Sequence, residues 1–274
     1  MSVQAIASPT GPSWIFRDSM VMVRRFVIHS LRQPELIVFS TIQPVMFVLL
    51  FRYVFGGAIQ TGTPYVDYLM PGIFVQTTVF GSMLTGMGLA YDLDNGIIDR
   101  FRALPMSRSA VLIGRTVTDA LRNLFVIVLM LLVGILVGFR IHGGIGGTVT
   151  AIALIVLFGF AFQWISALLG IAIRNPEAVQ SAGFIWVFPL TFLSSAFVPL
   201  NGIQPDWLQT VAKVNPFTIA VNASRQLFMG NEAAAIPGGP GTNATSNVVI
   251  TLIWVVGLLA IFMPLAVRQY RRSS

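Results

Sequence analysis

The side chains that most often carry out chemistry are scarce in this 274-residue chain. There is no cysteine, which excludes a disulfide framework and a thiolate metal site. The two histidines, His29 and His142, form no HxxxH or HExxH pair. The single lysine, Lys213, lies between Ala212 and Val214, so there is no P-loop for ATP. We therefore expect no catalytic, cofactor-binding or metal-binding residue in this chain.

Asp92 and Asp94 have the DxD spacing of some metal-sugar sites, but acids at a helix end or in a turn are commoner. They belong to a charged interruption, residues 91–122, which stands between two long uncharged stretches. This segment holds nine charged residues of a chain with only 17 Lys and Arg and 10 Asp and Glu. Because each charge centred in hydrocarbon costs about 2.5–3.5 kcal/mol, the segment must lie at a membrane surface.

The uncharged stretches predict an all-α polytopic membrane protein. The chain is 55% hydrophobic and 10% charged, whereas soluble domains are about 45–50% apolar and about 25% charged. Residues 1–13 are predicted to be a disordered tail, and residues 14–274 a single transmembrane domain. Six transmembrane helices are expected at residues 36–55, 68–90, 121–139, 149–173, 178–199 and 248–267. In the second of them, Ser82, Gly86 and Ala90 recur at a spacing that favours close helix packing.

The basic residues predict the orientation of these helices. The net charge of +7 could suggest a nucleic-acid partner, but the placement of the charges argues for membrane topology instead. Thirteen of the 17 Lys and Arg fall on the side that holds both termini and residues 91–122. By the positive-inside rule, that side is the cytoplasm. No acid lies at the centre of a predicted span, which argues against a proton- or sodium-coupled transporter.

Three further segments are predicted to be helices that do not cross the membrane. In residues 14–32 the apolar side chains fall on one side of a helix and the basic ones on the other, which favours an amphipathic helix lying on the membrane. Packing of this helix on a partner protein is the alternative. Residues 205–211 and 216–229 each begin with proline and are too short or too polar to span. We expect both to be half-buried near the outer leaflet, where they would cap the exit; a solvated loop is the alternative.

Several short motifs together resemble one family, the permease subunits of ABC transporters of the drug- and polysaccharide-export class, most closely the daunorubicin-resistance type. The resemblance covers nearly the whole chain, and its specificity lies in the order and spacing of the motifs. They are residues 96–105 (GIIDRFRALP) followed by 114–115 (GR), then 68–73 (YLMPGI), 174–179 (RNPEAV), 188–194 (FPLTFLS), 205–208 (PDWL) and 215–217 (NPF).

The resemblance implies a multi-pass protein of the bacterial cytoplasmic membrane that works in an assembly. The permease would pair with a second copy or a paralogue, and two cytoplasmic ATPase subunits would bind ATP and Mg and drive it. The helix at residues 14–32 and the loop after the second span would grip the ATPase. Residues 201–229 would form short helices dipping into the outer leaflet. The exported substrate would be an amphipathic drug, antibiotic or lipid; a lipid-linked glycan or envelope precursor, or a polytopic protein without transport, are the alternatives.

The loop after the second span carries our candidate ATPase-coupling residues. Residues 95–103 can form a short coupling helix that Pro105 ends. Its apolar edge would enter a cleft of the ATPase, with the charged residues at the rim. The alternative is that the arginines only enforce topology by binding headgroups. The candidate residues are Ile98, Asp99, Arg100, Phe101, Arg102, Leu104 and Pro105.

The second and fifth predicted spans carry our candidate substrate path. Large aromatic and methionine side chains suit flat amphipathic molecules, because they bind by area and dispersion with little hydrogen-bond readout. The alternative is that they are ordinary lipid-facing aromatics. The candidates are Phe74, Thr77, Phe80, Met83, Phe184, Phe188 and Phe192, with Gln76, Met87 and Trp186 beside them.

Overall fold

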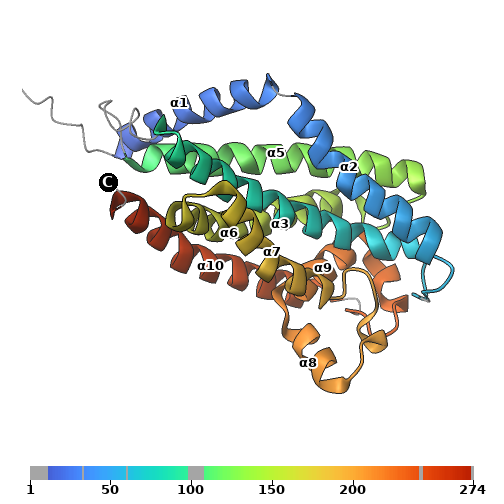
Figure 1. The fold of residues 1–274 in the computed structure, drawn as a ribbon. Coiled ribbons are helices and arrows are strands. Elements are labelled where there is room, and N and C mark those ends of the chain that lie inside the picture. The colour runs from blue at the N-terminus through green and yellow to red at the C-terminus, as the bar shows by residue number, and fades with distance from the viewer. Residues whose placement is uncertain (1–11, 33, 60, 98–107, 241–242, 273–274) are drawn as a thin grey trace, which may run out of the picture.

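A computed structural model describes residues 12–32, 34–59, 61–97, 108–240 and 243–272. Within these ranges every regular element is a helix, as predicted. The long helices lie side by side in a bundle, with α1 and the C-terminus at one end and α8 projecting near the other (Figure 1). The helices are α1 (Pro12–Leu31), α2 (Pro34–Leu50), η1 (Phe51–Phe55, a π-helix), α3 (Tyr65–Asp94), α5 (Arg108–Val137), α6 (Gly144–Ile173), α7 (Pro176–Phe192), η2 (Leu200–Gly202), α8 (Asp206–Val214), α9 (Pro216–Met229), η3 (Gly230–Ala235) and α10 (Ala244–Arg272).

Four helices in the described ranges are long and apolar enough to cross a membrane: Tyr65–Asp94, Ala110–Val137, Gly144–Ile173 and Ala244–Tyr270. They contain, apart from their ends, the predicted spans at residues 68–90, 121–139, 149–173 and 248–267. The predicted span at residues 36–55 corresponds to α2 followed by η1. Its apolar part, Thr41–Phe55, is shorter than the four helices named above.

The predicted helix at residues 178–199 is too long at its end. Helix α7 stops at Phe192, and residues 193–199 follow a turning, non-helical path. Pro189 lies within the last turn of α7, and the amide side chain of Asn215 binds the carbonyl oxygens of Leu190 and Leu193. Those oxygens would otherwise accept the N–H groups of a continuing helix, so α9 holds the point where α7 ends.

Other predicted bounds hold within a few residues. Helix α1 begins at Pro12, inside the predicted tail, and α8 runs from Asp206 to Val214. Helix α9 has the predicted limits. The turn between α6 and α7 is also found: Arg174 has a left-handed backbone with φ 60°, and the Asn175 side chain caps α7 by accepting the N–H of Ala178 at 2.9 Å.

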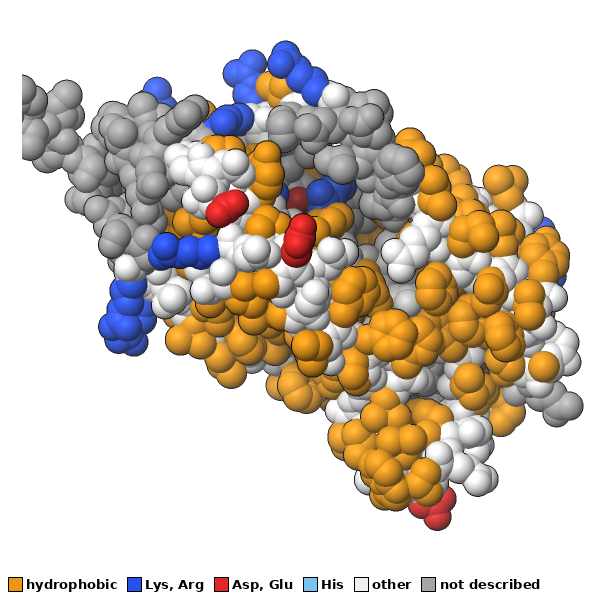
Figure 2. Space-filling view, viewed as in Figure 1, with side chains coloured by type: hydrophobic (Ala, Val, Ile, Leu, Met, Phe, Trp, Pro, Cys, Tyr) orange, Lys and Arg blue, Asp and Glu red, His pale blue; other side chains and the backbone are white. Residues whose placement is uncertain are grey.

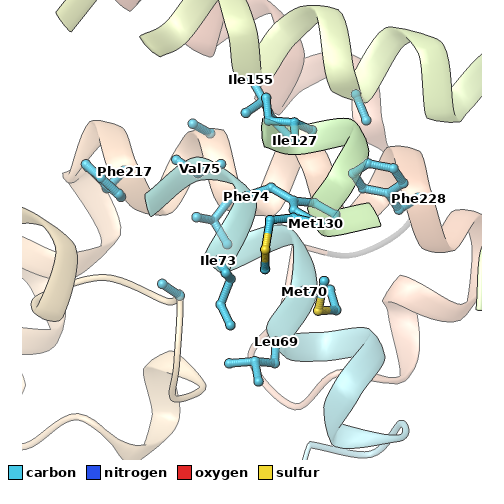
Figure 3. Close-up of a cluster of buried hydrophobic side chains, with 14 of the residues drawn as sticks. Leu69, Met70, Ile73, Phe74, Val75, Ile127, Met130, Ile155, Phe217 and Phe228 are labelled. Atoms are coloured by element: carbon cyan, nitrogen blue, oxygen red, sulfur yellow. The ribbon is translucent and has the colours of Figure 1, made fainter. Parts of the chain in front are cut away.

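Helix α3 lies at the centre of the bundle, and its N-terminal half supplies much of the core. Figure 3 shows side chains from α3, α5, α6 and α9 meeting in one apolar cluster. Its members include Leu69, Met70, Ile73, Phe74, Val75, Ile127, Met130, Ile155, Phe217 and Phe228. The predicted small-residue face of α3 makes the close contact with α6. A side chain on Gly86 would collide with the Ser166 carbonyl, and one on Gly170 would collide with that of Gly86.

The two outer helices differ in burial. Phe217 at the start of α9 is fully buried, whereas Trp207 of α8 is 66% exposed. Helix α9 packs between α3, α6 and α10, whereas α8 projects from the bundle (Figure 1), so the chain itself buries only α9; half-burial of both helices near the outer leaflet stays a prediction. On the face in Figure 2, most charged side chains gather at the end that carries α1 and the C-terminus, and hydrophobic ones cover most of the rest.

Candidate functional site

The seven predicted ATPase-coupling residues, Ile98 to Pro105, lie outside the described residues. The structure describes the two helices that lead to and from them. Helix α3 ends at Asp94, where the Asn95 side chain donates to the Tyr91 carbonyl at 2.9 Å, and α5 begins at Arg108.

A charge network joins these two helices beside the loop. The Nη1 atom of Arg115 on α5 donates to Oδ2 of Asp92 on α3 at 2.5 Å. The same guanidinium lies 3.8 Å from Asp119, which is itself 3.2 Å from Arg122. The side chains that form this network are between 7% and 19% exposed, so water screens their attraction only partly. The network therefore ties the ends of α3 and α5 together.

Helix α1 packs on the same part of α5. The guanidinium of Arg115 lies 5.5 Å from the ring centre of Phe26, within range of a cation–π interaction. A side chain on Gly114 would meet Met22, so the glycine allows α1 to approach closely. Arg115 on α5 therefore contacts both α1 and α3.

The predicted substrate-path residues meet only in pairs and do not share one surface. Phe74 is fully buried in the core between Phe139 and Phe228, and Met83 is buried beside Gly183. Neither lines a surface of the chain. Thr77 and Phe80 are partly buried, and Phe80 contacts Phe184 with ring centres 6.0 Å apart.

Phe188 and Phe192 instead belong to a ladder of aromatic rings that sequence analysis did not find. Their rings stack with centres 4.3 Å apart, and Phe192 stacks on Phe197 at 5.3 Å. Phe197 stacks on Phe51 of η1 at 4.6 Å, and Phe51 contacts Phe55 at 5.2 Å. We call these five rings the aromatic ladder. It runs from α7 to η1, and its end members are exposed, Phe188 by 50% and Phe55 by 40%.

One polar face of α9 was also missed. Asn215, Thr218, Asn222 and Arg225 recur at intervals of three, four and three residues, which places them on one side of the helix. All four form hydrogen bonds with the non-helical segment that follows α7. The spacing was visible in the sequence, but Arg225 was counted only as a basic residue of the outer side.

Arg225 is the one charged residue of this face, and it is only 1% exposed. Its Cζ atom lies 3.6 Å from the ring centre of Tyr68. The ion pairs of the described residues do not include it. Burial lowers the pKa of its guanidinium, but the ordinary arginine value is so high that the group stays charged at neutral pH.

Comparison with known protein families assigns the chain to one of them. The family described as ABC-2 type transporter matches residues 18–229, from α1 to the end of α9. The chain is an ABC-2 transporter permease. The matched part contains the Arg115 network, the aromatic ladder and the polar face of α9.

Individual ABC-2 relatives agree. The chain is 35% identical to the daunorubicin resistance ABC transporter permease protein DrrB1 of Streptomyces coeruleorubidus over 88% of this chain and 81% of that protein. It is 24% identical to the probable doxorubicin resistance permease protein DrrC of Mycobacterium tuberculosis, over 94% and 89%. It is 26% identical to the putative transport permease ycf38 of Cyanophora paradoxa, over 82% and 79%.

Membership of this family indicates which functions belong to this chain and which belong to a partner subunit. The chain is the multi-pass membrane subunit of an ABC transporter related to drug-resistance exporters. Such permeases lack ATPase activity, and the nucleotide is bound by an ATPase partner. The absence of a P-loop in the sequence fits this division, since Lys213 has no glycine-rich loop before it.

Proposed function

We propose that this permease exports flat amphipathic molecules through a path bordered by the aromatic ladder. The observation that carries the proposal is the continuous stack from Phe188 to Phe55, which joins α7 to η1 and leaves both end rings exposed. A flat aromatic substrate can extend such a stack at either end, since each aromatic contact contributes about 0.5–1.5 kcal/mol beyond the area it buries.

The chemistry of the aromatic ladder favours binding a range of related substrates over selecting a single one. Stacking needs area and flatness but few hydrogen bonds, so related ring systems would bind similarly. The names of two relatives specify resistance to daunorubicin or doxorubicin, compounds with flat fused rings. A substrate of that class is what the ladder of this chain would accept.

The proposed path requires α2 with η1 and α7 to cross the membrane together with the four longer helices. Pro34 to Phe55 is 22 residues of helix, about 33 Å at 1.5 Å per residue, which matches a hydrocarbon core of about 30 Å. Helix α7 is shorter, and the segment after it would complete the crossing under the cover of α9. Six spans place both termini on one side, and the excess of Arg on that side supports a cytoplasmic location.

The proposed assembly contains two permease chains and two ATPase subunits in a bacterial cytoplasmic membrane. Residues 98–105 would dock into the ATPase, and the Arg115 network would pass the motion to α1, α3 and α5. A stiff connection is needed, because a loose one would absorb the movement. The partly buried ion pair between Arg115 and Asp92 supports this role.

Reconstitution with the cognate ATPase tests the proposal. Proteoliposomes that hold both subunits should move daunorubicin when ATP is added, and should not do so when the ATPase carries a substitution of its P-loop lysine. The proposal fails if daunorubicin neither moves nor stimulates hydrolysis. Stimulation by a lipid-linked precursor alone would favour the alternative substrate class.

A further inference from the structure

Helix α7 is followed by a stretch of backbone, residues 193–197, that is neither helical nor exposed at the surface of the chain. Leu193 is partly buried and residues 194–197 are buried. Non-helical backbone at membrane depth is tolerated only where protein groups satisfy its N–H and C=O atoms. We call residues 193–197 the post-α7 segment. The N–H of Leu193 donates to the Pro189 carbonyl of α7 and that of Ala196 to the Ser194 hydroxyl, while the other partners described below come from α3 and α9.

The polar face of α9 meets the post-α7 segment along its length. Asn215 Nδ2 donates to the Leu193 carbonyl at 2.5 Å, and Thr218 Oγ1 accepts the N–H of Ser195 at 3.2 Å. Asn222 Oδ1 accepts the hydroxyl of Ser195 at 3.0 Å. Each of these three residues thus supplies one contact, at successive turns of α9.

Arg225 supplies most of the remaining contacts and connects three elements. Its Nη2 atom donates to the carbonyls of Ser195 at 2.5 Å and Ala196 at 3.1 Å. Its Nη1 atom donates to the Ser195 hydroxyl at 3.1 Å and to Asn222 at 3.2 Å, and Nε donates to the Tyr68 carbonyl of α3 at 2.9 Å. A guanidinium has five N–H donors, and this one makes five hydrogen bonds, so its geometry is fully determined.

The tyrosines of α3 complete the arrangement next to the aromatic ladder. Tyr68 donates its hydroxyl to the Ser195 carbonyl at 2.7 Å, and Tyr65 donates to the Phe197 carbonyl at 3.0 Å. Phe197 is the central ring of the ladder, stacked on Phe192 on one side and Phe51 on the other. The backbone that carries this ring is therefore fixed on its polar side by Arg225 and α3.

We propose that Arg225 is a positioning residue of the export path: through the post-α7 segment it fixes the ring of Phe197 within the aromatic ladder and so sets how tightly substrate engages the ladder. The inference depends on the proposed function, in which the ladder borders the path. Arg225 itself does not touch substrate. A lysine can keep the charge but, having one nitrogen, cannot reach acceptors on three elements at once.

The absence of cysteine from the chain allows a direct test. A single cysteine replaces Val198, which is 37% exposed and follows Phe197, and carries a nitroxide spin label. Its mobility is measured by electron paramagnetic resonance in reconstituted protein with Arg225, Arg225→Lys or Arg225→Gln. The same variants without the label are tested for ATP-dependent daunorubicin transport, giving the half-maximal concentration and the maximal rate. Arg140→Gln is the matched control, because Arg140 is an exposed outer-end arginine that binds carbonyls of its own segment.

We expect Arg225→Gln to raise the mobility of the label and to raise the half-maximal daunorubicin concentration about tenfold, with a smaller change in maximal rate. Arg225→Lys should lie between it and the wild type, and Arg140→Gln should change neither quantity. If Arg225→Gln proves unstable, Ser195→Ala replaces it. Ser195→Ala removes one acceptor of the guanidinium and should raise the half-maximal concentration about threefold.

The inference is overturned if folded Arg225→Gln or Ser195→Ala protein keeps both the label mobility and the half-maximal concentration of the wild type. It is overturned equally if these variants lower only the amount of folded protein, since that is the effect of a purely structural residue. If the wild type itself transports no daunorubicin, the proposed function fails for that compound. The label mobility then decides alone whether Arg225 positions the post-α7 segment.

Discussion

Arg115 and Asp92 stand 23 positions apart in the chain, and their side chains meet at 2.5 Å. The contact joins the last turns of α3 to the first half of α5. Gly88 leaves room for it, because a side chain at that position would overlap the guanidinium of Arg115. The loop that we propose to dock on the ATPase is thus flanked by two helices whose relative position is fixed by a charged contact.

Asp92→Asn should lower stability, because it leaves the partly buried guanidinium of Arg115 without its nearest counter-charge. We expect a loss of about 1–3 kcal/mol, measured as a lower melting temperature in detergent. Asp94→Asn is the matched control, since Asp94 is exposed two residues further along the same helix. Equal losses in the two variants would show that the ion pair contributes nothing beyond an ordinary surface acid.

Gly86→Leu should separate α3 from α6. A side chain at Gly86 points at the backbone of Ser166, which cannot move aside without shifting the whole of α6. We expect a loss of about 1–3 kcal/mol or more and a fall in the yield of monodisperse protein on size-exclusion chromatography. Gly257→Leu is the control, because a side chain at Gly257 on α10 meets no atom within 4 Å. A Gly86→Leu protein as stable as Gly257→Leu would contradict the close packing.

The close packing of α3 was predictable from sequence, although its partner α6 was not, because small residues four apart have few roles in a spanning helix besides close approach. The identity of the ladder residues was not predictable. Phe74 and Phe188 are both aromatic residues in apolar stretches, yet one is in the core and the other exposed. In a helix that is apolar on all sides, hydrophobic periodicity cannot separate the face toward protein from the face toward lipid.

Arg225 was missed for a different reason. A topology argument counts each Lys and Arg as solvated at the membrane surface. A guanidinium can instead be buried where carbonyl oxygens surround it, and those of Ser195 and Ala196 become available only because α7 ends early. That ending depends on contacts with α9, which lie more than 20 residues away in the chain. The spacing of Asn215, Thr218, Asn222 and Arg225 was the local signal that could have been used.

Phe188→Ala and Phe192→Ala should weaken substrate engagement. Removing Phe188 takes away the exposed end ring, and removing Phe192 breaks the stack between Phe188 and Phe197. The half-maximal daunorubicin concentration for transport should rise about 3- to 10-fold. Phe125→Ala is the matched control, because Phe125 on α5 is 53% exposed, like Phe188 at 50%, but lies outside the ladder. The ladder has no role in transport if all three variants behave alike.

The last prediction concerns the loop itself. Phe101→Ala with Arg102→Glu should leave insertion intact but abolish copurification of the ATPase or uncouple hydrolysis from export, since the first change removes an apolar anchor and the second reverses a rim charge. The competing interpretation is that Arg102 only enforces topology by binding headgroups. Arg174→Glu separates the two, because Arg174 occupies the α6–α7 turn on the same predicted side of the membrane. If residues 98–105 dock on the ATPase, the Arg174→Glu protein still copurifies with the ATPase and the Phe101→Ala, Arg102→Glu protein does not. If Arg102 only enforces topology, both charge reversals lower the amount of inserted protein, and Phe101→Ala alone has no effect. In that case the inserted protein still binds the ATPase.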